Sequence, residues 1–258
     1  MMEVYLQLIF YDREIFRRAL SRPHISGIVL GREFCPGLEF GLEDDNFEEL
    51  AHAILSRGKK LILNTPVYLT PELFEPYVRE LKARISHGLI SQLLVHDLGL
   101  LESLPKKRPP VCWDMWGLQR KFPTATAPFS LPFFDLLSSQ GVQRFEIPFH
   151  YYRSLARNGE KLDYPWQLRV STYYPVSFSR VCYSRTLSGL PCPACCNDFY
   201  LKPQGEPGEG YRVKGPTLLK KVPLPAKIVF PPGLTPDSVL VTAENLPHAE
   251  ILLKKLSL

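Results

Sequence analysis

The sequence predicts an α/β protein with a (β/α) TIM-barrel-like parallel sheet and an irregular, cysteine-containing segment over the carboxyl-terminal face of the barrel. Two observations carry this prediction: short apolar runs alternate with amphipathic helical patterns over the first two thirds of the chain, and several runs are nearly continuous in Val, Ile and Leu. Continuous apolar runs are typical of parallel strands that are covered on both faces. No dinucleotide-type glycine fingerprint is present, which favours a closed barrel over the alternative, an open doubly wound sheet.

Seven runs have the length and composition of strands. They cover residues 4–10, 25–30, 60–64, 89–95, 111–113, 144–148 and 166–172. Each is short enough for a barrel strand, and helical patterns separate several of them.

The segments between these runs carry helix signals. Asp45 and Glu48 form a capping-box-like pattern that begins one helix, and Gly58 ends it. A second helix begins at Pro71, a residue well suited to a first helical position, and ends at Gly88. Two shorter helices are expected over residues 12–21 and 131–139.

The composition changes after residue 172. Residues 173–236 are rich in Pro, Gly and aromatic residues, and residues 203–210 (PQGEPGEG) predict an exposed loop or hairpin tip. Residues 227–230 then predict a strand and residues 243–256 a closing helix. No internal repeat is found, so we expect residues 1–258 to form a single domain that includes the cysteine-rich segment.

The charge is mildly positive and spread along the chain. Lys and Arg number 31 against 26 Asp and Glu, a formal charge of +5, and the basic trio at residues 106–108 is read as a solvated loop. This pattern disfavours an electrostatic nucleic-acid binder.

The chain contains no run of about 18 apolar residues, so no transmembrane helix is predicted. The first residues resemble a strand rather than a signal peptide. A cytoplasmic location, where thiols stay reduced, is therefore expected.

The cysteines are unevenly distributed. Four of the six, Cys182, Cys192, Cys195 and Cys196, fall within fifteen residues. Thiolates this close repel one another and oxidise easily, so they are usually held by a soft metal centre. A tetrahedral zinc ion and a [4Fe–4S] cluster both accept four thiolates and remain alternatives.

The side chains of adjacent residues, such as Cys195 and Cys196, rarely both bind one small metal ion. A fourth ligand from another part of the chain is therefore favoured. Cys35 follows the run at 25–30, and Cys182 follows the run at 166–172. In a parallel barrel such positions open on the same carboxyl-terminal face. Cys112, inside a strand-like VCW, is expected to be a buried small hydrophobe.

The segment at residues 174–200 resembles the cysteine region of peptidase family U32 (collagenase-like), in particular its UbiV-type branch. In that region a cysteine after a barrel strand is followed by a C-x-x-C-C group. Further matches run in the same order through most of the chain: VLGREFC, NFEELAHAILSRGKKLILNTP, VHDLGLL and KIVFPPG. Two features depart from the pattern, a shorter interval between Cys182 and Cys192 and the central VCWDMWGLQ, where many relatives have His and Asn.

The resemblance implies a barrel-like fold and a [4Fe–4S] cluster held by Cys35, Cys182, Cys192 and Cys196, with Cys195 as the non-ligand of the adjacent pair. It also implies a role in oxygen-independent hydroxylation, as in ubiquinone biosynthesis. A heterodimer with a second U32-family protein and a small aromatic or quinone-precursor substrate are expected. The alternatives are hydroxylation of RNA bases, a U32 peptidase, and an electron-transfer or scaffold subunit.

A classical protease is disfavoured, because the sequence has no H-E-x-x-H or G-x-S-x-G motif. The six histidines are scattered and are read as surface or packing residues. Four charged residues near predicted strand ends are pocket candidates, although a structural ion pair is favoured for each, and catalytic residues stay unassigned. These candidates are Glu33, Asp97, Asp114 and Arg180.

Overall fold

A computed structural model describes twelve parts of the chain. These are residues 2–8, 13–31, 44–66, 69, 71–115, 131–148, 167–171, 177–178, 199–201, 211–214, 217–219 and 236–242. Everything said below concerns these residues.

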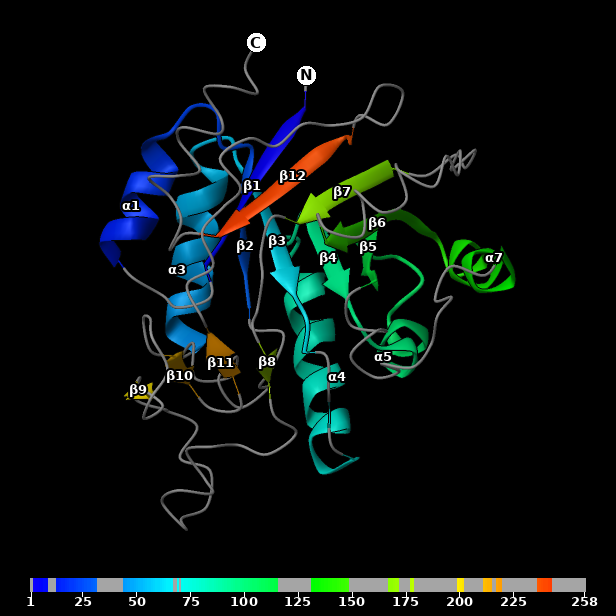
Figure 1. Ribbon diagram of the computed structural model, residues 1–258. Helices are drawn as coiled ribbons and strands as arrows, with labels where there is room; N and C mark the ends of the chain where they lie inside the picture. The colour runs from blue at the N-terminus through cyan, green and yellow to red at the C-terminus, as the bar shows by residue number, and fades with distance from the viewer. Residues whose placement is uncertain are drawn as a thin grey trace.

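Eight strands close into a barrel (Figure 1). Every neighbouring pair runs parallel, in the order β1-β12-β7-β6-β5-β4-β3-β2. The strands are β1 (Glu3–Gln7), β2 (Gly27–Leu30), β3 (Lys60–Asn64), β4 (Gln92–Val95), β5 (Val111–Asp114), β6 (Val142–Pro148), β7 (Gln167–Ser171) and β12 (Ser238–Thr242). The predicted barrel is therefore confirmed, and the open sheet is excluded.

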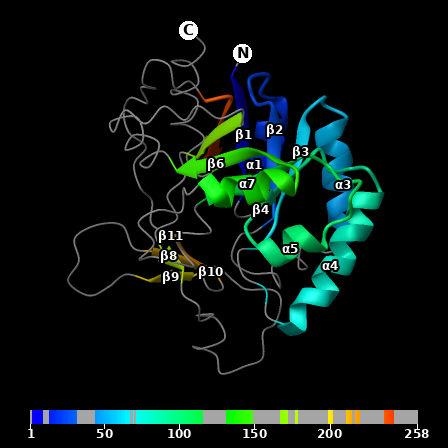
Figure 2. The same cartoon turned by 90° about the vertical axis from the view of Figure 1, so that its right-hand side faces the viewer.

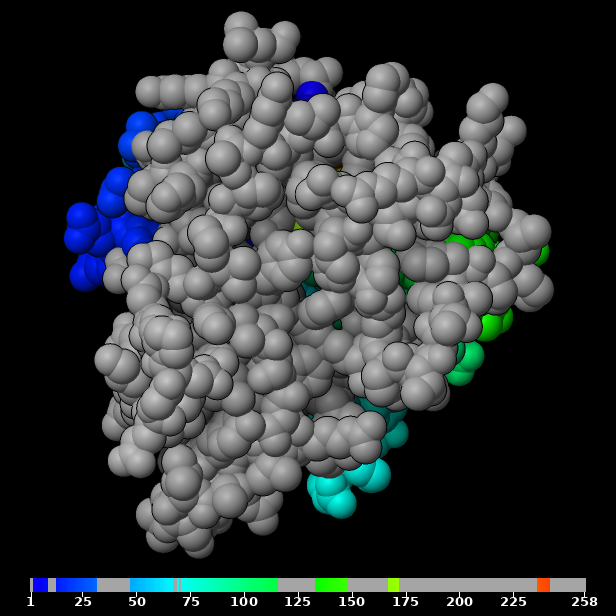
Figure 3. Space-filling model, in the orientation of Figure 1, coloured from blue at the N-terminus to red at the C-terminus, as the bar shows by residue number. Residues whose placement is uncertain are grey.

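Helices surround the barrel, as Figure 2 shows. They are α1 (Arg13–Ser21), α3 (Asp44–Leu55), α4 (Pro71–Ser86), α5 (Leu98–Ser103) and α7 (Leu131–Ser139). Parts of α1, α4 and α7 lie at the left, bottom and right edges of the space-filling view in Figure 3, as expected for an outer layer. Four of the five predicted helices are confirmed, whereas α5 was not predicted because its six residues are too few to show a helical period. No helix of the described residues is long and apolar enough to cross a membrane.

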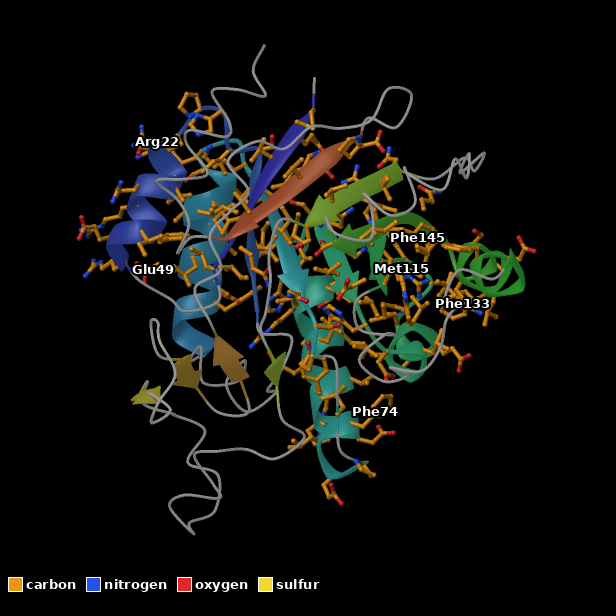
Figure 4. The ribbon with its side chains drawn as sticks, viewed as in Figure 1. Arg22, Glu49, Phe74, Met115, Phe133 and Phe145 are labelled. Carbon is orange, nitrogen blue, oxygen red and sulfur yellow. The ribbon has the colours of Figure 1, made fainter. Side chains whose placement is uncertain are left out.

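The strands separate two packed regions. Outward-facing side chains such as Trp113 and Phe145 pack against the helices, and the Phe145 ring lies 4.9 Å from that of Phe134 on α7. Figure 4 shows Phe145, Met115 and Phe133 on this side of the barrel. The inward-facing apolar residues form a separate cluster: Tyr5, Val29, Ile62, Leu94, Cys112 and Leu240. Cys112 is fully buried in it, which confirms the expectation for this residue.

The strand that closes the barrel was missed by the sequence analysis. β12 pairs with β1 on one side and β7 on the other, from Glu3 opposite Ser238 to Gln7 opposite Thr242. It has only three apolar residues between a Ser and a Thr, so its hydrophobic signal is weak. The expected strand at 227–230 and the expected helix at 243–256 lie outside the described residues.

A second, antiparallel sheet has the order β8-β11-β10-β9. Its strands are β8 (Ser177–Phe178), β9 (Phe199–Leu201), β10 (Tyr211–Lys214) and β11 (Thr217–Leu219). In Figures 1 and 2 it lies beyond the carboxyl-terminal ends of the barrel strands. This position agrees with the predicted segment over that face, although the sequence did not predict a sheet there. The predicted loop at 203–210 is outside the described residues, but β9 and β10 on either side of it pair as a hairpin does.

Candidate functional site

The predicted cluster ligands Cys35, Cys182, Cys192 and Cys196 lie outside the described residues. The same is true of the predicted non-ligand Cys195 and of the pocket candidates Glu33 and Arg180. Within the described part of the chain, no group of three or more His, Cys, Asp or Glu side chains is arranged to hold a metal ion. The four ligands therefore stay a prediction, and the site described below is built from other residues.

A row of four ionisable side chains crosses the inside of the barrel. Asp114 on β5, Glu146 on β6 and Arg169 on β7 are partners in the strand register, and His96 directly follows β4, so it is the next member of the row. All four are buried. A buried charge is costly unless it faces an opposite charge, and Glu146 lies beside the permanently charged Arg169 in this row.

His96 lies between two oxygen atoms. Its Nδ1 is 2.8 Å from Oδ2 of Asp114, with the two side chains 0% and 4% exposed. Its Nε2 is 2.5 Å from Oδ1 of Asn64 at the end of β3. The three side chains come from the ends of three consecutive strands, so the barrel backbone fixes their separation.

Arg169 anchors the other end of the row. Its guanidinium donates to Oε1 of Gln92 and to Oγ of Ser238, the latter at 3.4 Å, and Nη1 is 3.6 Å from Oε2 of Glu146. The guanidinium carbon also lies 4.4 Å from the centre of the Tyr5 ring, within the range of a cation–π interaction. These contacts from four strands hold a fully buried cation in the middle of the barrel.

Polar side chains also form an inward-facing layer near the carboxyl-terminal end. In a barrel of this kind, four side chains from alternate strands share one layer. By the register, that layer contains Gln7, Asn64, Asp114 and Ser171, from β1, β3, β5 and β7, and all four are buried. The apolar cluster lies below it. The barrel interior therefore ends in hydrogen-bonding groups at the face where barrel proteins bind ligands. We call these four residues and His96 the polar floor.

The opposite, amino-terminal end has its own charge cluster. Glu3 accepts hydrogen bonds from Lys60 and, at 2.5 Å, from the Tyr5 hydroxyl, and Arg144 lies 3.7 Å away. Burial alone would raise the pKa of Glu3, but the Lys60 and Tyr5 hydrogen bonds and the positive charges outweigh it and lower that pKa. Burial and the Glu3 hydrogen bond raise the pKa of Tyr5. This end is opposite the face where barrel proteins bind ligands, so we assign it a structural role.

Two pocket candidates can be placed. Asp97 caps α5, because its carboxylate accepts a hydrogen bond from the Leu100 amide at 3.0 Å. Asp114 lies inside the barrel and faces His96. Asp97 thus has a structural role as a helix cap, which differs from the expected ion pair, whereas Asp114 belongs to the polar floor.

The sequence analysis missed His96, Asn64, Glu146 and Arg169. For His96 and Asn64 a signal was present, since each is the first polar residue after a continuous apolar run, in QLLVH and LILN. Such a residue lies at the carboxyl end of a buried strand, where barrel sites are built. His96 had instead been read as a surface or packing residue; it is buried, and it is paired with a carboxylate.

No protein-family model matches the chain, and no curated protein matches it either. Among solved structures, the chain is similar to the U32 peptidase Mk0906, with 12% identity and a TM-score of 0.49 over 94% of this chain and 92% of that one. It is also similar to a chain of the tryptophan synthase α2β2 complex from the hyperthermophile Pyrococcus furiosus. That similarity has 12% identity and a TM-score of 0.43 over 98% of this chain and 94% of the other. The barrel fold itself rests on the strand order described above.

Proposed function

We propose that this chain is a U32-type, single-domain iron–sulfur protein that supports oxygen-independent hydroxylation of a small aromatic or quinone-precursor substrate, as in ubiquinone biosynthesis. Cys35, Cys182, Cys192 and Cys196 hold a [4Fe–4S] cluster at the carboxyl-terminal mouth of the barrel. The protein works in the cytoplasm with a second U32-family subunit. The proposal rests on the cysteine pattern of the sequence, and one feature of the fold supports it most: the strands that precede the cysteines.

Cys35 comes five residues after the end of β2, and Cys182 comes four residues after the end of β8. A fully extended chain advances at most about 3.6 Å per residue, so these cysteines stay within roughly 18 Å and 14 Å of those strand ends. β2 ends at the mouth, and β8 belongs to the small sheet beyond it. These short connections support the proposal that both ligands belong to one site above the mouth.

The four proposed cysteine ligands fit a [4Fe–4S] cluster. Four cysteine thiolates are the usual ligands of a [4Fe–4S] cluster, and ligands from two distant segments suit a multi-atom cluster better than a local zinc site. When bound, such a cluster supplies or accepts single electrons. The chain's own polar floor would orient a substrate below it through amide, hydroxyl and carboxylate groups. The buried apolar cluster beneath the floor would keep water out of the barrel.

The peptidase alternative is not supported by the histidine geometry. In a nucleophile–His–Asp triad, one ring nitrogen faces the carboxylate and the other faces the nucleophile. His96 does face Asp114, but its second nitrogen contacts the Asn64 amide oxygen, which is not a nucleophile. With the Asn64 amide at Nε2, the His96 ring is not placed to activate a hydroxyl or thiol.

Anaerobic purification with iron and sulfide assays tests the proposal. We expect brown protein with four irons per chain, the number that the cluster itself requires. Cys35→Ala should abolish the visible absorbance, and Cys195→Ala is the matched control that should preserve it. Colourless protein with one zinc per chain, unchanged in Cys35→Ala, would defeat the proposal.

Tagged protein, purified under the same conditions, tests the partner. We expect a second U32-family chain to co-purify with it. Recovery of stoichiometric RNA with no protein partner would favour the RNA-hydroxylation alternative.

A further inference from the structure

We propose that the exposed arginines of α1, together with Arg57, bind the surface of a membrane that contains anionic lipids. The arginine surface consists of Arg13, Arg17, Arg18, Arg22 and Arg57. The inference goes beyond the proposed function and does not rest on it. It is carried by the position of these side chains, by their charge and by the composition of the surface around them.

The arginines of α1 lie on the outside of the barrel. Arg13, Arg17 and Arg18 are exposed, whereas Phe16 and Ala19, on the other side of the helix, are buried in the core. Part of α1, in blue, projects at the left edge of the space-filling view (Figure 3). Because the apolar side of α1 packs against the barrel, the helix meets a partner through its charged side alone.

Arg57 extends this surface from the next connection between a helix and a strand. The Lys59 ammonium donates hydrogen bonds to the backbone oxygens of Arg22 and Ile25, both at 2.7 Å, and so ties this connection to the one that follows α1. Arg57 is exposed and lies two residues before Lys59; burial and the Arg57 charge together lower the pKa of Lys59. The arginine surface therefore continues from α1 to the amino-terminal end of the barrel, where Figure 4 labels Arg22. A contact here leaves the opposite mouth open.

The arginines do not stabilise the helix that carries them at its first turn. Arg13 is the first residue of α1, where the helix dipole favours a negative charge. Arg13 and Arg17 are four residues apart, as are Arg18 and Arg22, and like charges at this spacing repel each other. No carboxylate of the described residues forms an ion pair with Arg13, Arg17, Arg18 or Arg57. An anionic surface would relieve this repulsion.

Two acidic side chains moderate the charge. Glu14 is the one carboxylate of α1. Glu49 is exposed on α3 and lies nearer the carboxyl-terminal end of the barrel than Arg22 does (Figure 4). Five arginines against these two glutamates leave a net charge of +3. Basic clusters of about this size on a helix are typical of surfaces that bind anionic lipids.

The composition of this surface fits lipid phosphates better than RNA or a protein partner. The planar guanidinium matches the oxygens of a phosphate. Single-stranded RNA is usually stacked on aromatic side chains, and the exposed residues of α1 include none. Stable protein interfaces have an apolar core, whereas the exposed large hydrophobic residues of the described chain, Leu73 and Leu136, belong to α4 and α7. The contact is therefore electrostatic, without insertion into the bilayer.

Co-sedimentation of the full chain with lipid vesicles tests the inference. At physiological salt the protein should bind vesicles of phosphatidylcholine and phosphatidylserine, mixed at about two to one, and should not bind vesicles of phosphatidylcholine alone. Binding should be lost near 1 M salt, where the screening length is about 3 Å. Equal binding to the two kinds of vesicle, no binding to either, or binding that survives high salt would overturn the inference.

A double variant locates the contact on the protein. Arg17→Gln with Arg18→Gln should weaken vesicle binding by about 25-fold, at about fivefold for each arginine. Lys106→Gln with Lys107→Gln is the matched control, because it removes the same charge from two exposed lysines of another segment. This control should bind vesicles like the wild type. Equal losses in the two double variants would show that net charge, rather than the arginine surface, governs binding. If the arginine variant does not fold, the two vesicle compositions still decide the question with unaltered protein.

A labelled uridine oligonucleotide tests the RNA alternative, and we expect no measurable binding at physiological salt. Oligonucleotide binding that depends on Arg17 and Arg18 would overturn the choice of a membrane. Iron content, measured on the same samples, keeps this inference apart from the proposed function. Brown protein that ignores anionic vesicles refutes only the membrane contact, and colourless protein that binds them through the arginine surface refutes only the cluster.

Discussion

Asp114 and Glu146 are direct partners in the register of two neighbouring parallel strands, and both carboxylates are buried inside the barrel. Like charges directly opposite each other destabilise a sheet. Each carboxylate has a nitrogen-bearing side chain on its far side, His96 for Asp114 and the permanently charged Arg169 for Glu146. Four consecutive strands thus depend on one another electrostatically as well as through backbone hydrogen bonds.

This dependence predicts the effect of removing Arg169. Arg169→Met should lower the free energy of unfolding by about 3–5 kcal/mol, because Glu146 would remain buried beside Asp114 without its cation. The double variant Glu146→Met, Arg169→Met should lose less than Arg169→Met alone. Urea unfolding at pH 7 measures both, and a larger loss in the double variant than in Arg169→Met would show that the two side chains do not act as a pair.

The cluster at the amino-terminal end predicts a pH dependence. The pKa of Glu3 is lower in the folded protein than in the unfolded chain, so this carboxylate adds stability above its unfolded pKa and loses it as pH falls through its folded pKa. Glu3→Gln should therefore cost up to about 1 kcal/mol at pH 7, since both partners are partly exposed, at 28% for Glu3 and 50% for Lys60.

Urea unfolding at a series of pH values checks this. The difference between wild type and Glu3→Gln should shrink as pH falls below about 4, the ordinary range of a glutamate. A difference that stays constant down to pH 2 would mean that packing rather than charge explains the loss.

Gly31 predicts a sharp steric effect. Its φ is +100°, and a Cβ at this position would overlap the backbone oxygen of Asn64. Gly31→Ala should cost about 3 kcal/mol or more. Gly58→Ala is a matched control, because its φ is also positive, at +68°, but nothing lies near its Cβ position; about 1 kcal/mol is expected. Thermal unfolding measures the loss of stability in each variant. Similar losses would contradict the close approach of Gly31 to the Asn64 backbone.

Cys112 should be chemically inert in the folded protein. Burial raises the pKa of its thiol to about 12, so the reactive thiolate is scarce at ordinary pH. Peptide mass spectrometry after iodoacetamide treatment at pH 8 should find Cys112 unlabelled in native protein and labelled in urea. Labelling at comparable rates in both conditions would show that the interior opens readily.

The sequence predicted the parts of the fold that depend on local patterns. Gly58 and Gly88 were expected to end two helices, and each follows its helix with a positive φ. The inward-facing charges could not be predicted in the same way. In VQRFEIP, polar Arg144 and Glu146 alternate with apolar Phe145 and Ile147, a pattern that usually means a strand with one face in water. Here the apolar face meets the helices and the polar face turns into the closed barrel.

The candidate site was predictable only in its location. The carboxyl-terminal face followed from the barrel, and Asp114 was among the residues expected there. The partners of Asp114 depend on register, which places residues 96, 114, 146 and 169 in one row although they are far apart in sequence. Single-sequence patterns carry no information about such a row, so His96 could not be recognised as its member.

The pairing of β1 with β12 also governs the order of events during synthesis. Residue 3 finds its strand partner only when residue 238 has left the ribosome, so the first strand has one edge open until then. Non-local pairings of this kind slow folding and leave hydrogen-bonding edges available to other chains. A nascent chain that stops before residue 238 would hold seven barrel strands in an open sheet. We therefore expect such truncated products to depend on chaperones or to aggregate.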